Sequence, residues 1–276
     1  MYPSKAKFDN AEPKNFLNFN QVFKDVKLLG AGGFGETRLI VDRMSGKKYA
    51  LKLLKKFDKM DYYREISALI KLSASPNCNP NIVCYYDHFK LNKYYCILTE
   101  YIEGMTLRDF DLKYRLSVND VKYIGLWLLK VLNYLHSNGY AHNDISDNNI
   151  IVTHDKKLKL IDLGITCYDK ANGYLKCDVN RAIQLYYQSP ELHTRYYVRN
   201  PKKYSKTSDI YATGVILYEL FTGEQPYDRN KNGDIISPYH NIRNVPCINN
   251  VLKKMLTINP DQRINANQAY TLLKNC

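Results

Sequence analysis

Residues 140–164 read YAHNDISDNNIIVTHDKKLKLIDLG, and this stretch decides how the rest of the chain is interpreted. Two short apolar runs, at 150–152 and 158–161, are separated by a polar turn. Short β-rich runs joined in this way predict a hairpin. The residues before the first run and after the second therefore lie at the same end of that hairpin.

Three oxygen-bearing side chains stand at this end. Asn149 lies at the entrance of the hairpin and Asp162 at its exit, so we expect the two side chains to meet on one side of it. Asp144 precedes Asn149 by five residues, in a loop rich in Asn and Asp. Such oxygen ligands suit a hard divalent cation and a phosphate, with one carboxylate left over for a proton.

Size and composition indicate a soluble globular protein. The chain has 276 residues, enough for one large domain or two compact lobes with a good core. Hydrophobic residues make up 45% and charged residues 24%, which are ordinary values. No run of eighteen apolar residues occurs, so no membrane span is predicted. The N-terminus lacks the apolar centre of a signal peptide.

The cysteine spacing and the charge distribution argue against a disulfide framework, a zinc site and a nucleic-acid-binding surface. Seven cysteines without a C-x-x-C pair argue against a disulfide framework and against a zinc site. We therefore expect reduced thiols and an intracellular location, cytoplasmic before nuclear. The net charge is +13, but the lysines are spread from Lys5 to Lys274. Spread charge favours a basic solvated surface over a nucleic-acid-binding one.

The first hundred residues predict a sheet with one helix. Residues 1–20 are polar and lack a period, so we interpret them as an N-terminal extension. Strand-like runs are separated by turn-rich residues, and one stretch has helical spacing. The predicted strands are 22–30, 35–43, 47–56, 81–89 and 94–101, and the predicted helix is 58–72.

After residue 104 the pattern becomes helical. A capping-box-like start at Ser117 and an end at Gly139 bound the first long helix. Further helices are predicted over 208–221, 248–256 and 265–274. The whole is an α+β protein with a domain over 21–276. Its small N-terminal lobe covers about 21–100, a hinge about 100–104, and a larger, mainly helical C-terminal lobe about 105–276.

Four further motifs follow the same order as in a known family. Residues 30–35, GAGGFG, match G-x-G-x-x-G between two strands, whereas a Rossmann turn would open a helix. Lys52 ends a Y-A-L-K run close to V-A-I-K. Residues 189–191, SPE, match A-P-E, and residues 209–214 match D-x-W-x-x-G with Tyr for Trp. With H-x-D-x-x-x-x-N and D-L-G, the chain resembles a eukaryotic-type protein kinase catalytic domain, serine/threonine-like, over about residues 24–273.

The resemblance implies a bilobal fold, ATP and Mg²⁺ as cofactors, and a protein substrate. Asp144 would accept the proton of the substrate hydroxyl, and Asn149 and Asp162 would hold the metal. Lys52, paired with Glu65, would reach the α- and β-phosphates. The expected catalytic residues are thus Asp144, Lys52 and Asn149. The expected nucleotide-binding residues are Gly30, Ala31, Gly32, Gly33, Phe34, Gly35, Thr37, Ala50, Lys52, Glu65, Glu100, Ile102 and Ile151.

Several residues depart from the kinase pattern. Asn143 replaces the Arg of H-R-D, so control through a phosphorylated activation loop is not expected. Ser146 replaces the Lys that touches the γ-phosphate, and Gln184 replaces a Thr that reaches the catalytic Asp. Losing a cation near the transferring phosphoryl group should slow the chemistry. Leu163 replaces the Phe of D-F-G, one apolar residue for another.

Three interpretations of the activity compete. The first is an active protein kinase, and serine/threonine specificity is chosen because the tyrosine-kinase Arg is absent at Asn148. The second is a pseudokinase, a nucleotide-binding interaction module, against which the complete catalytic set argues. The third is a small-molecule phosphotransferase of the aminoglycoside or choline kinase type. The glycine-rich loop, Asp209 and Arg263, the expected partner of Glu191, argue against it.

Overall fold

The computed structural model describes residues 13–32, 35–55, 59–169, 175–176, 186–192, 206–231 and 234–276. The chain divides into two compact units. The first comprises Met1–Glu103 with Ile161–Gly164, and the second comprises Gly104–Leu160 with Ile165–Cys276. The short segment Ile161–Gly164 therefore groups with the N-terminal unit, although its chain neighbours on both sides belong to the other.

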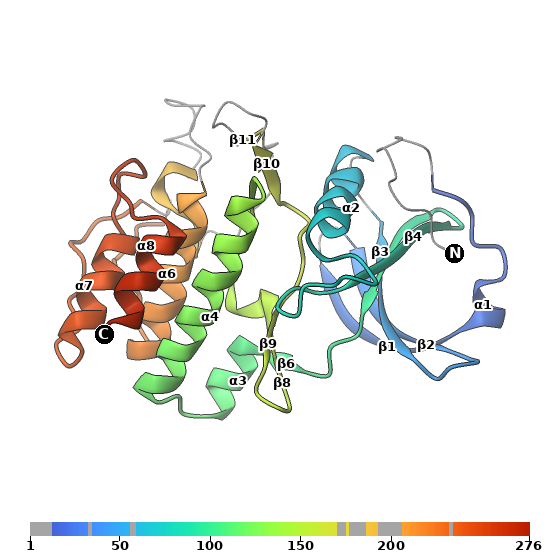
Figure 1. Cartoon of the computed structure of the whole chain (residues 1–276), viewed down its shortest axis with the longest axis horizontal. Helices are drawn as coiled ribbons and strands as arrows, with labels where there is room; N and C mark the ends of the chain where they lie inside the picture. Colours follow the sequence, from blue (N-terminus) through green and yellow to red (C-terminus); the bar gives the residue numbers. More distant parts are fainter. Residues whose placement is uncertain are drawn as a thin grey trace. The chain divides into compact units, whose positions relative to one another are not determined.

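The first unit is built on the predicted five-stranded antiparallel sheet (Figure 1). Its strands, in the order β1-β2-β3-β5-β4, are β1 (Phe23–Gly32), β2 (Gly35–Asp42), β3 (Lys48–Leu54), β5 (Tyr94–Glu100) and β4 (Tyr85–Leu91). β4 begins four residues later than predicted. Asn79 Oδ1 accepts a hydrogen bond from the Asn81 amide, and this turn keeps the residues before Tyr85 out of the ladder.

Helix α2 (Lys59–Ser73) follows β3 and buries one side. Ile66, Leu69 and Leu72 are buried at helical spacing, as the sequence predicts. The Tyr62 ring packs edge-on against the Tyr95 ring of β5 with centroids 4.9 Å apart. These contacts fix the helix against the sheet and thereby set the position of its Glu65.

Part of the predicted N-terminal extension packs onto this unit. The Phe16 amide donates to the Lys90 carbonyl at 2.8 Å, and the Lys90 amide donates to the Lys14 carbonyl at 2.9 Å. A short helix follows, α1 (Phe19–Val22). The Phe19 ring lies 5.3 Å from the Phe23 ring and is buried in the core of the sheet. The boundary between extension and domain stays a prediction.

The second unit is mainly helical (Figure 1). In the described residues its α-helices are α3 (Leu107–Lys113), α4 (Val118–Ser137), α6 (Thr207–Thr222), α7 (Pro246–Met255) and α8 (Ala266–Lys274). The predicted capping box opens α4, because the Asp120 amide donates to Ser117 Oγ and the Ser117 amide to Asp120. At Gly125 a Cβ would come 2.9 Å from the side chains of Leu217 and Leu273, so the glycine permits close packing of α4 on α6 and α8.

Short strands complete this unit. The predicted hairpin is confirmed as β8 (Ile150–Thr153) and β9 (Leu158–Leu160), with β6 (Gly104–Thr106) paired to β8. A second small sheet contains β7 (Tyr140–Ala141), β10 (Cys167–Asp169) and β11 (Leu175–Lys176). Within the ranges that the structure describes, no helix has the length and apolar character needed to cross a membrane.

The expectation of reduced thiols is wrong. Cys78 pairs with Cys84, Cys247 pairs with Cys276, and Cys167 is also disulfide-bonded. In the described part of the chain only the buried Cys96 is free. The Cα atoms of Cys247 and Cys276 are 5.6 Å apart, although 29 residues separate them in the sequence. Folding brings such pairs together, and spacing rules such as C-x-x-C do not detect them.

The Cys247–Cys276 bond ties the first turn of α7 to the end of the chain, and its loss should destabilise the fold. From its sequence separation of 29 residues, we expect Cys276→Ser to lose about 3–4 kcal/mol of unfolding free energy, because the unfolded chain gains freedom. Urea unfolding under non-reducing conditions measures this difference. The same comparison in excess reductant is the control, and the two proteins should then unfold alike. A persisting difference would trace the loss to packing at residue 276.

Candidate active site

Lys52 occupies the centre of the site in the first unit. Its neighbours on β3, Leu51 and Leu53, are buried, and the alternation of a strand turns Lys52 to the opposite face. Lys52 Nζ lies 2.7 Å from Glu65 Oε1 of α2 and 2.9 Å from Asp162 Oδ1. The predicted pair of Lys52 and Glu65 is present, and Asp162 joins it as a second carboxylate.

The two carboxylates keep Lys52 charged. Burial alone lowers the pKa of the Lys52 ammonium, but the negative charges of Asp162 and Glu65 outweigh it and raise this pKa above its ordinary value. Glu65 is only 6% exposed, and burial raises the pKa of its carboxyl while Lys52 opposes that rise. The result is a fixed cation whose charge does not depend on pH near neutrality, an arrangement suited to holding an anion such as a phosphate.

Asp162 is held by a special backbone conformation. Its φ is +59°, in the left-handed region, where Asp is tolerated better than most residues. The Gly164 amide donates to Asp162 Oδ1 at 3.0 Å. A Cβ on Gly164 would lie 2.9 Å from that oxygen and 3.3 Å from Lys52 Nζ. The absence of a side chain at Gly164 is therefore what lets the cation and the carboxylate meet.

In the second unit, Asp144 and Asn149 contact each other directly. Asn149 Nδ2 donates to both the carbonyl and the Oδ2 of Asp144, at 2.8 Å in each case. Asn149 ends a 3-10 turn, Asp147–Asn149, immediately before β8. These two side chains are therefore adjacent. Their hydrogen bonds fix the orientation of the Asp144 carboxylate.

Asp209 anchors the loop that carries Asp144. This residue lies in the first turn of α6 and is buried. Its carboxylate accepts hydrogen bonds from the amides of His142 at 2.8 Å and Asn143 at 2.7 Å. His136 Nε2 of α4 lies 2.8 Å from the same carboxylate, a partner that the sequence analysis missed. His142 itself is fully buried, which fits a packing role.

A buried ion pair supports the second unit. Arg263 Nη1 and Nη2 donate to the two oxygens of Glu191 at 2.6 and 2.9 Å, and both side chains are fully buried. The guanidinium also lies over the Tyr211 ring, 5.0 Å from its centroid. The predicted pairing is confirmed. A bidentate contact of this kind holds the turn at Glu191 to the region before α8.

Removing one member of this pair leaves a buried charge alone. We expect Arg263→Ala to lower the unfolding free energy by about 3–5 kcal/mol. Chemical denaturation measures the change. The matched control is Lys157→Ala, which breaks the exposed contact of Lys157 with Asp155 and should leave stability unchanged within error. Equal effects of the two substitutions would contradict the assignment of a structural role to the Glu191 pair.

Comparison with known proteins agrees with this geometry. The protein kinase domain model matches residues 23–273. The chain belongs to the protein kinase domain family. The kinase fold predicted from the sequence is thereby confirmed.

Individual kinases match over most of this chain. Calcium-dependent protein kinase 4 of Plasmodium berghei (strain Anka) is 30% identical over 251 residues, which cover 84% of this chain and 44% of that protein. The maternal embryonic leucine zipper kinase of Danio rerio is 32% identical over 72% of this chain and 29% of its own length. Serine/threonine-protein kinase 36 of Pongo abelii is 28% identical over 87% of this chain and 18% of its own length. The chain thus spans less than half the length of these relatives.

The departures from the kinase pattern have structural correlates. Asn143, at the Arg position of H-R-D, has a φ of +63° and donates from Nδ2 to the Ile165 carbonyl at 3.4 Å. Ser146 is fully buried and presents no charge where kinases carry a Lys. Leu163 is fully buried, as expected of an apolar substitute for Phe. Gln184 lies outside the described residues.

The predicted nucleotide-binding residues come from several elements. They are Gly30, Ala31 and Gly32 in β1, Gly35 and Thr37 in β2, Ala50 in β3, Glu100 at the end of β5, Ile102 just after it, and Ile151 in β8. Gly33 and Phe34 lie outside the described residues. At Gly35 a Cβ would lie 2.0 Å from the Leu53 carbonyl, so this glycine serves strand packing. Gly30 and Gly32 have no atom within 4 Å of such a Cβ, which leaves room for a ligand beside β1.

The metal donors expected here are few but chemically suitable. Among the residues that the structure describes, no group of three His, Cys, Asp or Glu side chains could hold an ion. Of the two oxygen donors predicted from the sequence, Asp162 belongs to the first unit and has a side chain that is 41% exposed, and Asn149 belongs to the second unit. A small set of oxygen donors fits Mg²⁺, which keeps several waters and binds substrate phosphates.

The role of Gly164 gives a direct test of the Lys52 site. Gly164→Ala should push Asp162 and Lys52 apart and weaken binding of Mg-ADP by about tenfold, the loss of roughly one charge-assisted hydrogen bond. Calorimetric titration measures the affinity. Lys157→Ala, which breaks an exposed contact with Asp155, is the control and should bind as the wild type does. An unchanged affinity in Gly164→Ala would show that nucleotide binding does not require the geometry around Lys52.

Proposed function

We propose that this kinase domain transfers the γ-phosphoryl group of Mg-ATP to hydroxyl groups of proteins, on serine and threonine. The observation that carries the proposal is the position of Lys52 between Glu65 at 2.7 Å and Asp162 at 2.9 Å. This is the ion pair that phosphoryl-transfer enzymes of the kinase class use to hold ATP phosphates. The complete set of catalytic residues argues against a pseudokinase.

Each residue has one task in this proposal. Lys52 binds the α- and β-phosphates, and Glu65 keeps it aimed at them. Asp144 orients the substrate hydroxyl and accepts its proton, while the hydrogen bonds from Asn149 hold its carboxylate in place. Asn149 and Asp162 would supply oxygen ligands to the metal. Bound Mg²⁺ would neutralise charge on the phosphates.

The substrate class rests on the relatives. Serine/threonine-protein kinase 36 carries that specificity in its name, and the Arg of tyrosine kinases is replaced by Asn148. The neutral, buried Ser146 removes a cation from the neighbourhood of the γ-phosphate. We therefore propose an enzyme slower than kinases that carry Lys there. An intracellular location, where ATP is available, belongs to the same proposal.

The test is a kinase assay with a defined catalytic variant. Purified protein is incubated with Mg-ATP and peptides that carry Ser, Thr or Tyr as the acceptor, and the phosphorylated residue is identified by mass spectrometry. Asp144→Asn should reduce the rate by about 10²- to 10⁴-fold, the usual contribution of a general base. Chelation of Mg²⁺ should abolish transfer.

The control variant is Asp155→Asn. Asp155 lies on the exposed turn between β8 and β9. The Asp155→Asn variant should therefore transfer phosphate at the wild-type rate. Undiminished transfer by Asp144→Asn would remove that residue from its role. ATP binding without transfer would support the pseudokinase, and transfer to small molecules alone would support the third interpretation.

A further inference from the structure

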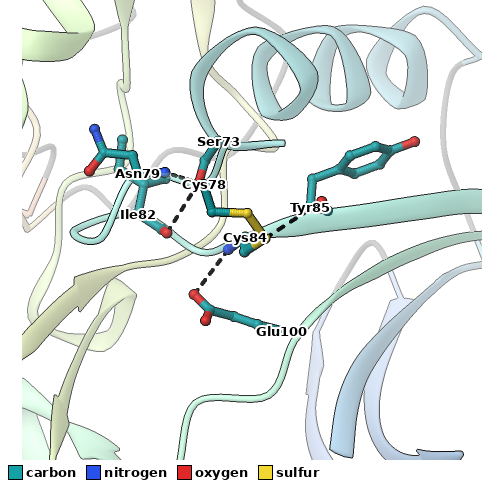
Figure 2. The surroundings of a disulfide bond; sticks show 7 residues. All are labelled: Ser73, Cys78, Asn79, Ile82, Cys84, Tyr85 and Glu100. Atoms are coloured by element: carbon teal, nitrogen blue, oxygen red, sulfur yellow. Dashed lines mark hydrogen bonds between the residues drawn. A yellow bond between two sulfur atoms is a disulfide. The ribbon is translucent and has the colours of Figure 1, made fainter. Parts of the chain in front are cut away.

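The disulfide between Cys78 and Cys84 lies next to Glu100, which begins the predicted hinge and is one of the residues expected to bind nucleotide (Figure 2). Cys84 is buried directly before β4, and its amide donates to the Glu100 carboxylate at 3.0 Å. The Glu100 amide donates in return to the Cys84 carbonyl at 2.9 Å. Cys84 and Glu100 are thus joined by two hydrogen bonds of opposite direction, a pairing that we call the hinge clamp.

The hinge clamp has a direct connection to the nucleotide site. Glu100 is the last residue of β5, and the chain leaves the sheet through residues 101–103 immediately after it. Glu100 and Ile102 are among the residues expected to line that site. Whatever fixes Cys84 therefore fixes the start of the segment that would contact the nucleotide.

The loop that contains Cys78 has a second set of restraints. Ser73 Oγ accepts from the Asn79 amide at 3.2 Å and donates to the Ile82 carbonyl at 3.3 Å. The Ser75 amide donates to the Tyr85 carbonyl at 2.9 Å. These bonds hold the base of the loop without the sulfur bridge. Opening the disulfide should consequently loosen Cys84 without unfolding the unit.

The two sulfurs differ in their surroundings. Cys78 is only partly buried and follows the exposed Asn77, whereas Cys84 is buried. An external thiolate can therefore attack the Cys78 sulfur, with the Cys84 thiolate as the leaving group. Disulfides in reducing compartments are commonly transient and redox-sensing. This combination distinguishes the pair from a purely structural bridge.

We propose that Cys78 and Cys84 form a redox switch that acts on nucleotide binding through the hinge clamp. In the oxidising direction the two thiols react with glutathione disulfide through a mixed disulfide. One protein disulfide forms, and two electrons and two protons pass to glutathione, which leaves as two thiols. The oxidised form holds Glu100 and binds nucleotide more tightly than the reduced form. This inference rests on the proposed function.

The experiment measures nucleotide affinity against redox state. The full chain is equilibrated in buffers of different ratios of glutathione to glutathione disulfide, and the state of Cys78 and Cys84 is read by alkylation and mass spectrometry. Binding of a fluorescent ADP analogue with Mg²⁺ is titrated at each ratio. We expect about three- to tenfold weaker binding in the reduced form, the equivalent of one hydrogen bond in the hinge clamp.

Matched variants separate this disulfide from the others. Cys78→Ser should bind with the weaker affinity at every ratio, whereas Cys247→Ser and Cys167→Ser should keep the redox dependence. Glu100→Ala should also bind weakly, with a smaller redox difference, because one hydrogen bond of the hinge clamp is missing.

Equal affinities of the oxidised and reduced wild type would overturn the inference, as would a redox difference that persists in Cys78→Ser. Nucleotide binding that ignores redox state rejects the switch alone and leaves the proposed function standing. Absence of nucleotide binding in both states rejects the proposed function and the switch with it.

Discussion

One partly buried lysine charge constrains the whole first unit. An ammonium that is partly shielded from water is stabilised by carboxylates at close range, and Lys52 meets two of them, at 2.7 and 2.9 Å. One comes from α2, so the helix must pack against the sheet at the height of β3. The other comes from Asp162, so the segment Ile161–Gly164 must group with this unit rather than with its chain neighbours. The left-handed backbone at Asp162 and the missing side chain at Gly164 are local adjustments to the same requirement.

In the second unit, too, charged side chains are stabilised by partners at close range. Here the buried charges are Asp209, which accepts two backbone amides, and Glu191, which is bound by Arg263. Each buried carboxylate ties a loop to a helical part of the unit. The loop that carries Asp144 and the turn at Glu191 are thereby fixed, although neither contains a long regular element. Polar contacts of this type are used where helix packing alone does not position a loop.

Much of the fold and part of the candidate site were predictable, because they depend on sequence patterns within single elements. Apolar periodicity located the strands and helices, and capping chemistry placed the start of α4. The pairing of Lys52 with Glu65 and that of Glu191 with Arg263 followed from the resemblance to a family, which carries information on contacts between distant residues. The disulfides, the contact of His136 with Asp209 and the interplay of Gly164 with Lys52 depend on how separate elements meet in space. No spacing in the chain reports such contacts, and for that reason they were missed.

Residues 14–16, which precede the part of the chain that matches the kinase domain, pair with an edge of the five-stranded sheet. β4 is one of the two outer strands, and the backbone of residues 14–16 occupies hydrogen-bonding positions along it. Unpaired strand edges are templates for pairing with other chains. Residues 14–16 of the extension therefore cover part of the β4 edge. A chain that begins at Phe23 would lack these hydrogen bonds and would expose the edge of β4 to pairing with other molecules in solution.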